Sequence, residues 1–107
     1  MTMVYLFHMS DADFIITTIQ TKINDLHDLG VKRIGIFGSS VRGDAKPTSD
    51  IDVVIDFEDG KKSYRNFIGT ATYLEKLFNR KIDAITPNSI SPYLKADIDK
   101  EIRYVQI

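Results

Sequence analysis

The chain has 107 residues, of which 43% are hydrophobic and 27% charged, and its formal net charge is −1. This length fits one domain with a single modest core. With 14 basic and 15 acidic residues, the chain lacks the clustered positive charge that a protein coating nucleic acid requires. The absence of cysteine excludes disulfides and thiolate metal sites. No apolar run reaches the roughly 18–20 residues of a membrane span and the N-terminus has no signal-like pattern, so we expect a cytoplasmic protein.

Residues 1–9 show no clear pattern, and we take them as an N-terminal extension of a single domain at residues 10–107. Ser10 is a good N-cap, and acidic residues in the first turn are followed by apolar residues at helical spacing. One helix from Ser10 to Gly30 is therefore predicted. Surface, solvated positions are expected for the three adjacent basic pairs, which are Lys32-Arg33, Lys61-Lys62 and Arg80-Lys81.

The middle of the chain predicts two strands joined by a glycine-serine turn. The first strand, Val31–Phe37, places Gly35 opposite its isoleucines, which indicates a close approach by another group. One turn of helix is predicted over Ser39–Arg42, ended by Gly43, and an irregular loop follows. The second strand is Ile51–Phe57.

The last part of the chain predicts a helix, a strand and a further helix. Ser63 caps the long helix to Asn79, the strand is Lys81–Thr86, and the final helix starts at Ser91-Pro92. The apolar residues of that final helix are Leu94, Ile98 and Ile102. The order helix, strand, strand, helix, strand, helix predicts an α+β fold, a small mixed β-sheet with helices packed on one face and carboxylates on the other.

Three aspartates are candidate metal ligands. Asp50 and Asp52 stand one residue apart and point to the same face of a strand, and Asp83 lies on a strand that could pair beside it. Like charges on one face repel each other, and hard divalent cations would resolve the conflict. The alternative is structural, with Asp50 capping a turn and the other two carboxylates at an edge or in solvent. We expect Asp56, farther along the same face, to be solvated.

The turn after the first strand is a candidate phosphate site. Gly38 lets the backbone approach an anion closely, and the following N–H groups, with the hydroxyls of Ser39 and Ser40, would bind it. Arg42 could neutralise a carboxylate or a phosphate, or lie exposed. The alternative is an ordinary strand-to-helix turn with a serine cap. A phosphate-binding turn and carboxylates on successive strands together indicate metal-assisted transfer at a nucleoside triphosphate.

The string Gly38-Ser39-x₁₀-Asp50-x-Asp52 resembles the signature of the DNA polymerase beta-like nucleotidyltransferase superfamily. The short length and the segment Arg-Lys-Ile-Asp-Ala-Ile-Thr at 80–86 resemble the minimal nucleotidyltransferases, the MntA-like antitoxins of HEPN/MNT toxin–antitoxin systems. The similarity runs from about Ser10 to the C-terminus, so it implies the polymerase beta-like nucleotidyltransferase fold for the whole domain.

The resemblance implies that this chain is an enzyme that transfers AMP from ATP, with Mg²⁺, to a hydroxyl of a HEPN ribonuclease toxin. The acceptor is expected to be a tyrosine, and the two proteins are expected to form a hetero-oligomer without membrane or direct nucleic-acid binding. Catalytic and metal-binding roles are implied for Asp50, Asp52 and Asp83, and nucleotide-binding roles for Gly38, Ser39, Ser40 and Arg42.

Two other functions stay open. Larger relatives carry an extra helical domain for their acceptor, and 107 residues leave no room for one, so we expect another protein chain to complete the acceptor site. A transferase with a small-molecule acceptor is one alternative. A non-catalytic antitoxin that neutralises its partner by binding alone is the other.

Overall fold

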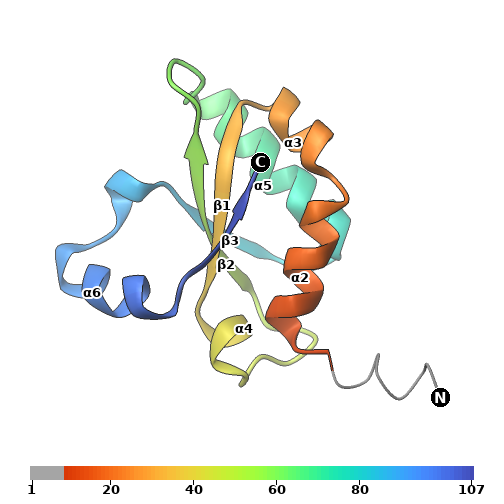
Figure 1. Ribbon diagram of the computed structural model, residues 1–107, viewed down its shortest axis with the longest axis vertical. Helices are drawn as coiled ribbons and strands as arrows, with labels where there is room; N and C mark the ends of the chain where they lie inside the picture. The colour runs from red at the N-terminus through yellow and green to blue at the C-terminus, as the bar shows by residue number, and fades with distance from the viewer. Residues whose placement is uncertain (1–8) are drawn as a thin grey trace.

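A four-stranded mixed sheet forms the centre of the computed structural model, which describes residues 9–107 (Figure 1). The predicted extension at residues 1–9 thus lies, except for Met9, outside the described residues. The strands are β1 (Val31–Phe37), β2 (Ile51–Phe57), β3 (Ile82–Ile85) and β4 (Arg103–Gln106), in the spatial order β3-β2-β1-β4. β1 is antiparallel to β2 and β4, whereas β2 and β3 are parallel. The sheet confirms the predicted α+β class.

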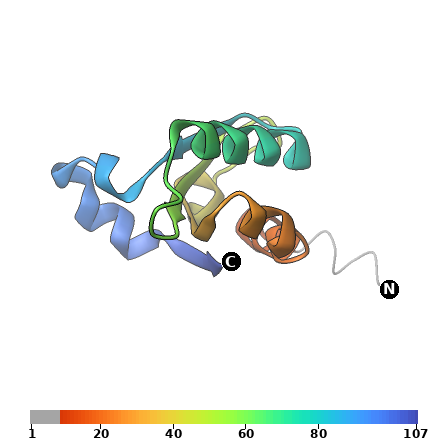
Figure 2. The same cartoon turned by 90° about the horizontal axis from the view of Figure 1, so that it is seen from above.

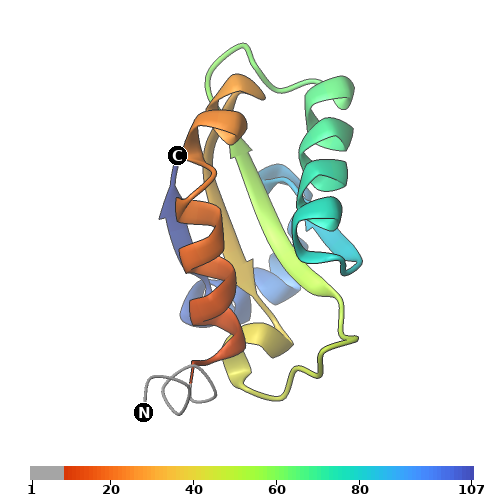
Figure 3. The ribbon, with the colours of Figure 1, turned by 90° about the vertical axis from the view of Figure 1, so that its right-hand side faces the viewer.

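Three helices cover one face of this sheet: α2 (Asp11–Gln20), α3 (Ile23–Asp28) and α5 (Tyr64–Phe78) (Figure 3). The core lies between them and the sheet, because alternate strand residues point to that face. Its fully buried strand residues are Val31, Ile34, Ile36, Ile51, Val53 and Ile55. None of the helices in residues 9–107 is long and apolar enough to cross a membrane.

The single opening helix predicted between Ser10 and Gly30 is wrong, because the structure breaks it at Thr21 and Lys22 into α2 and α3. The break follows threonines whose hydroxyls bond back to the backbone. Thr21 Oγ1 donates to the carbonyl of Thr18 at 2.6 Å, and Thr18 Oγ1 donates to that of Phe14 at 2.7 Å. Such bonds compete with the helical ladder. Ser10 does cap α2, since its Oγ accepts from the N–H of Asp13.

The end of the chain also differs from the prediction. After a short 3₁₀ turn, η1 (Pro87–Ser89), helix α6 (Pro92–Glu101) lies on the side of the sheet opposite α2 and α5 (Figure 2). Of its three predicted apolar residues only Ile98 is buried. Leu94 is 55% exposed, and Ile102 lies beyond the helix end in extended backbone. Residues 103–106, for which no strand was predicted, then pair with β1 as β4.

β4 explains the glycine in the middle of β1. A Cβ atom at Gly35 would lie 2.5 Å from Ile102 Cδ1 and 2.8 Å from Tyr104 Cε1. The predicted close approach at Gly35 is therefore correct, and the approaching groups come from the C-terminal segment.

Two arginines and an aspartate expected in solvent are instead paired. Arg80 is only 11% exposed and binds Asp11 through both carboxylate oxygens, at 2.7 and 3.2 Å, while its Nε donates to the carbonyl of Ser49. Arg33 binds Asp56 at 3.1 Å and stacks on the ring of Tyr104. The local sequence gave no sign of these partners, because all of them lie more than twenty residues away.

The contrast between two glycines gives a stability test. We expect Gly35→Ala to lower the free energy of unfolding by about 1–3 kcal/mol, because it overpacks the Ile102 and Tyr104 contact. Gly69→Ala should instead raise it by about 0.5–1 kcal/mol, because Gly69 lies inside α5 and its added methyl would make only an ordinary 3.4 Å contact with Leu29. Urea unfolding of both variants measures the difference. Equal effects of the two substitutions would contradict the packing described here.

Candidate functional site

Strand register brings the turn and two of the aspartates into one row across the sheet. Phe37 of β1 pairs with Asp52 of β2, which in turn pairs with Asp83 of β3. Paired residues on neighbouring strands point to the same face, so the Asp52 and Asp83 carboxylates lie side by side on the face opposite the hydrophobic core. Gly38 follows Phe37 directly, and the helical turn α4 (Ser39–Arg42) starts there, as predicted.

Gly38 and Asp52 are in contact in a way that only glycine allows. Gly38 has φ +78°, a backbone conformation that residues with a side chain rarely adopt. A Cβ atom at this position would also lie 2.1 Å from Oδ2 of Asp52. The glycine of the predicted phosphate site therefore makes room for the carboxylate of the predicted metal site.

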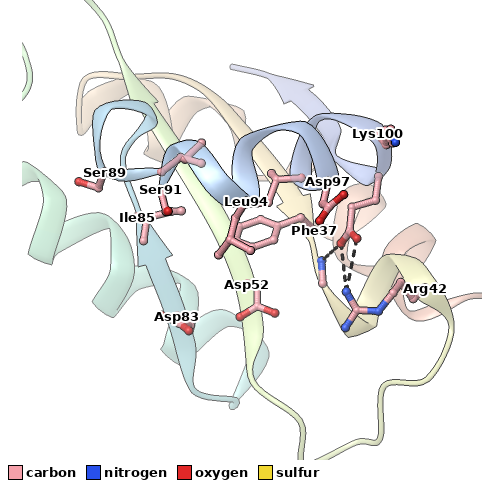
Figure 4. A pocket seen from close by; sticks show the side chains of 14 residues that line it. Phe37, Arg42, Asp52, Asp83, Ile85, Ser89, Ser91, Leu94, Asp97 and Lys100 are labelled. Atoms are coloured by element: carbon pink, nitrogen blue, oxygen red, sulfur yellow. Dashed lines mark hydrogen bonds and ion pairs between the residues drawn. The ribbon is translucent and has the colours of Figure 1, made fainter.

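A cavity of about 820 Å³ lies between this row and helix α6 (Figure 4). Its volume is within the range of small-molecule sites, roughly 300–1,000 Å³. The sheet contributes Asp52, Asp83 and the apolar side chains of Phe37 and Ile85, and the turn contributes Gly38 and Arg42. The opposite wall consists of residues from η1 to the end of α6, among them Leu94, Asp97 and Glu101.

Asp52 lies in surroundings that disfavour its ionised form. Partial burial is the largest cause that raises the pKa of its carboxyl, followed by the negative charges of Asp83 and Asp50 and, more weakly, that of Glu101. The positive charge of Arg42 lowers the pKa in part. Its ionised form is therefore short of compensating positive charge, and a bound cation would relieve the repulsion.

The structure brings together four of the seven predicted site residues. Gly38, Arg42, Asp52 and Asp83 line the cavity. Asp50 is exposed directly before β2, close enough to affect Asp52 but outside the cavity wall.

The two serines of the turn are also outside the wall. Ser39 is half-buried and Ser40 fully buried. The Ser40 hydroxyl is the one buried side-chain polar atom in residues 9–107 without a hydrogen-bond partner.

Glu101 is the site residue that the sequence analysis missed. The N–H of Gly38 donates to Oε2 of Glu101, and Arg42 Nη1 lies 3.3 and 3.4 Å from the two carboxylate oxygens (Figure 4). One local signal was available. Glu101 is the last residue of a helix, where the macrodipole disfavours negative charge, so a compensating partner elsewhere in the fold could have been expected.

The carboxylate pair fits a hard cation that is shared with a substrate. Within residues 9–107 no three His, Asp or Glu side chains stand close enough to hold a metal ion by themselves. Asp52 and Asp83 offer oxygen ligands from two side chains. Mg²⁺ is commonly bound in this way, by one or two carboxylates with water and substrate phosphates completing its shell.

Comparison with known proteins agrees with this geometry. Residues 16–105 match the family model described as "Nucleotidyltransferase domain". The protein adenylyltransferase MntA of Thermococcus cleftensis is 33% identical over 97 residues, which cover 91% of this chain and 95% of that protein.

Two solved structures share the fold. A minimal nucleotidyltransferase has a TM-score of 0.70 at 24% identity, with 90% of this chain and 96% of that chain covered. A chain from the complex of a tri-AMPylated HEPN toxin of Shewanella oneidensis with its MNT antitoxin has a TM-score of 0.54 at 21% identity, with 78% and 66% covered. From the family match and the MntA relative, we conclude that this chain belongs to the nucleotidyltransferase domain family, as an MntA-like minimal nucleotidyltransferase.

Proposed function

We propose that this chain is a Mg²⁺-dependent protein adenylyltransferase that acts as an antitoxin, transferring AMP from ATP to a tyrosine hydroxyl of a HEPN toxin. The observation that carries the proposal is the row of Gly38, Asp52 and Asp83 along one wall of the cavity. The likeness to a protein adenylyltransferase of Thermococcus cleftensis supports a protein as the acceptor. The AMPylated toxin complex supports AMP as the transferred group and a HEPN toxin as the acceptor protein.

In this proposal Gly38, Arg42 and the three aspartates each have a task, and nucleotide binding by Ser39 and Ser40 stays a prediction. The Gly38 N–H and the Arg42 guanidinium bind phosphate oxygens, and Asp52 and Asp83 hold Mg²⁺, with Asp50 as a further ligand from the start of β2. When bound, Mg²⁺ neutralises charge on the phosphates and on the leaving pyrophosphate. Asp83 accepts the proton of the acceptor hydroxyl. The hydroxyl oxygen bonds to the α-phosphorus as the bond from that phosphorus to the bridging oxygen breaks, and pyrophosphate leaves.

Transfer to a partner protein is the direct test. We expect the wild-type chain, incubated with a HEPN toxin, ATP and Mg²⁺, to increase the intact mass of the toxin by whole adenylyl groups. Asp52→Asn and Asp83→Asn should each slow transfer roughly 100-fold or more, because each removes charge stabilisation from the transition state. Asp59→Asn, in an exposed turn away from the cavity, is the matched control.

The two alternatives have different outcomes in the same assay. Neutralisation of the toxin that survives both Asp52→Asn and Asp83→Asn would favour an antitoxin that acts by binding alone. An unmodified toxin together with nucleotide transfer to a small hydroxyl compound would favour the small-molecule transferase. No transfer with any nucleotide would count against the proposal as a whole.

The raised pKa of Asp52 predicts an inverse relation between stability and function. Because the folded-state pKa is higher than the unfolded one, the protonated group contributes stability that is lost as pH rises through the folded pKa. At pH 7 without Mg²⁺, we therefore expect Asp52→Asn to raise the Tm, with a gain that shrinks as pH falls towards 4. Mg²⁺ should raise the Tm of the wild type but not that of this variant. A lower Tm for Asp52→Asn at pH 7 would contradict the electrostatic account.

Replacing Gly38 should weaken the binding of the metal ion and the binding of phosphate together. We expect Gly38→Ala to weaken nucleotide and Mg²⁺ binding and to lower the free energy of unfolding by about 1 kcal/mol or more, because of the positive φ and the displaced Asp52 carboxylate. Gly43→Ala is a matched control, since Gly43 also has positive φ, at +88°, but its added methyl would meet no atom within 4 Å. Binding titrations and urea unfolding separate the two effects. Normal nucleotide and Mg²⁺ binding by Gly38→Ala would contradict the described contact.

A further inference from the structure

The donors assigned to phosphate are already bound to a carboxylate of the chain itself. The N–H of Gly38 and the guanidinium of Arg42 both contact Glu101, the final residue of α6. The side chain of Glu101 is only 23% exposed, whereas that of Arg42 is 55% exposed. Glu101 is thus drawn into the cavity and presents two anionic oxygens to the turn, in the way that a phosphate would.

The body of helix α6 buries little apolar surface of its own. Every residue from Pro92 to Lys100 is exposed except Ile98. Ile98 is 9% exposed, and it lies outside the main hydrophobic core between the sheet and the other helices. A helix with so little buried apolar surface opens locally at low cost. At its C-terminal end α6 is held by the Glu101 contact and by the chain that follows it, because Ile102 packs on Gly35 and β4 pairs with β1 from Arg103 onward.

Glu101 and a nucleotide compete for these donors, since the one N–H of Gly38 cannot serve both. The Gly38 N–H is a single donor, and Arg42 Nη1 together with its positive charge is also directed at Glu101. In addition, the charge of Glu101 contributes to the repulsion felt by Asp52, so an incoming triphosphate would add negative charge to a site that already holds too much. Binding with Glu101 in place is disfavoured by both effects.

We propose that Glu101 is a built-in competitor of the nucleotide, which occupies the phosphate donors of the free enzyme and is expelled when the triphosphate binds. Expulsion detaches the last turn of α6 from Gly38 and Arg42 and opens that side of the cavity, while β4 keeps the following residues paired with β1. The inference rests on the proposed function, because it takes the Gly38 turn as the triphosphate site. It makes Glu101 a residue that sets nucleotide affinity, not one that touches the reacting atoms.

A different role for Glu101 would have the opposite signature. If its carboxylate were a ligand of the catalytic cation, removing its charge would weaken the binding of the metal and the nucleotide together. If it competes with phosphate, removing its charge should strengthen nucleotide binding, because the apparent dissociation constant falls as the fraction of competent enzyme rises.

The test compares Glu101→Gln with Glu75→Gln in the full chain. Glutamine keeps the shape of the side chain but loses its charge, and Glu75 is an exposed glutamate on α5, in the layer of helices away from the cavity. With AMP-PNP and Mg²⁺ as the probe in calorimetric titrations, we expect Glu101→Gln to lower the Kd by roughly 3- to 10-fold, the scale of the difference between a charge-assisted and a neutral hydrogen bond. Glu75→Gln should leave the Kd unchanged.

Hydrogen exchange of the wild-type chain provides a readout that needs no variant. We expect AMP-PNP with Mg²⁺ to increase amide exchange in residues 95–102 while it decreases exchange around the turn at residues 37–43. A Kd for Glu101→Gln that is unchanged or raised, or α6 amides that become protected on binding, would overturn this inference and leave the proposed function intact. If AMP-PNP binds none of the three proteins, the nucleotide site and this inference are both wrong.

Discussion

The pairing of Phe37, Asp52 and Asp83 across three strands is the constraint on which the rest of the site depends. It places two carboxylates side by side and sets the glycine turn against one of them. The hydrophobic core fixes this register, because a slip of one residue in β2 would turn Ile51, Val53 and Ile55 away from the core. The free energy gained by burying isoleucine and valine on one face of the sheet thus offsets the charge repulsion on the other face.

Local patterns were enough to predict most of the framework. The strands Val31–Phe37 and Ile51–Phe57 and the turn Ser39–Arg42 have the predicted bounds, because alternation, glycine and serine act within a few residues. Ser63 caps α5 through the N–H of Asn66, as its position indicated. The closeness of Asp52 and Asp83 could be predicted in the same way. Each lies at an equivalent place in an apolar strand, so pairing of the two strands is enough to bring the carboxylates together.

What could not be predicted depends on contacts between distant parts of the chain. β4 is short and mostly exposed, and its place beside β1 follows from the room that Gly35 leaves for Ile102 and Tyr104. α6 lies on the other side of the sheet from the core, so Leu94 and Ile102 do not form the buried stripe that their spacing indicated. Glu101 reaches Gly38 across 63 positions of sequence, and no pattern in either segment specifies the other.

The ion pair of Arg80 has a consequence for how small this catalytic unit can be made. Arg80 follows α5, yet it binds Asp11 at the start of α2 and the carbonyl of Ser49 next to Asp50. Helix α2, the end of α5 and the loop before β2 are thereby held at one point. A shortened protein that kept only the strand–turn–strand segment would lose this brace, so the minimal autonomous form of the site must begin at or before Asp11.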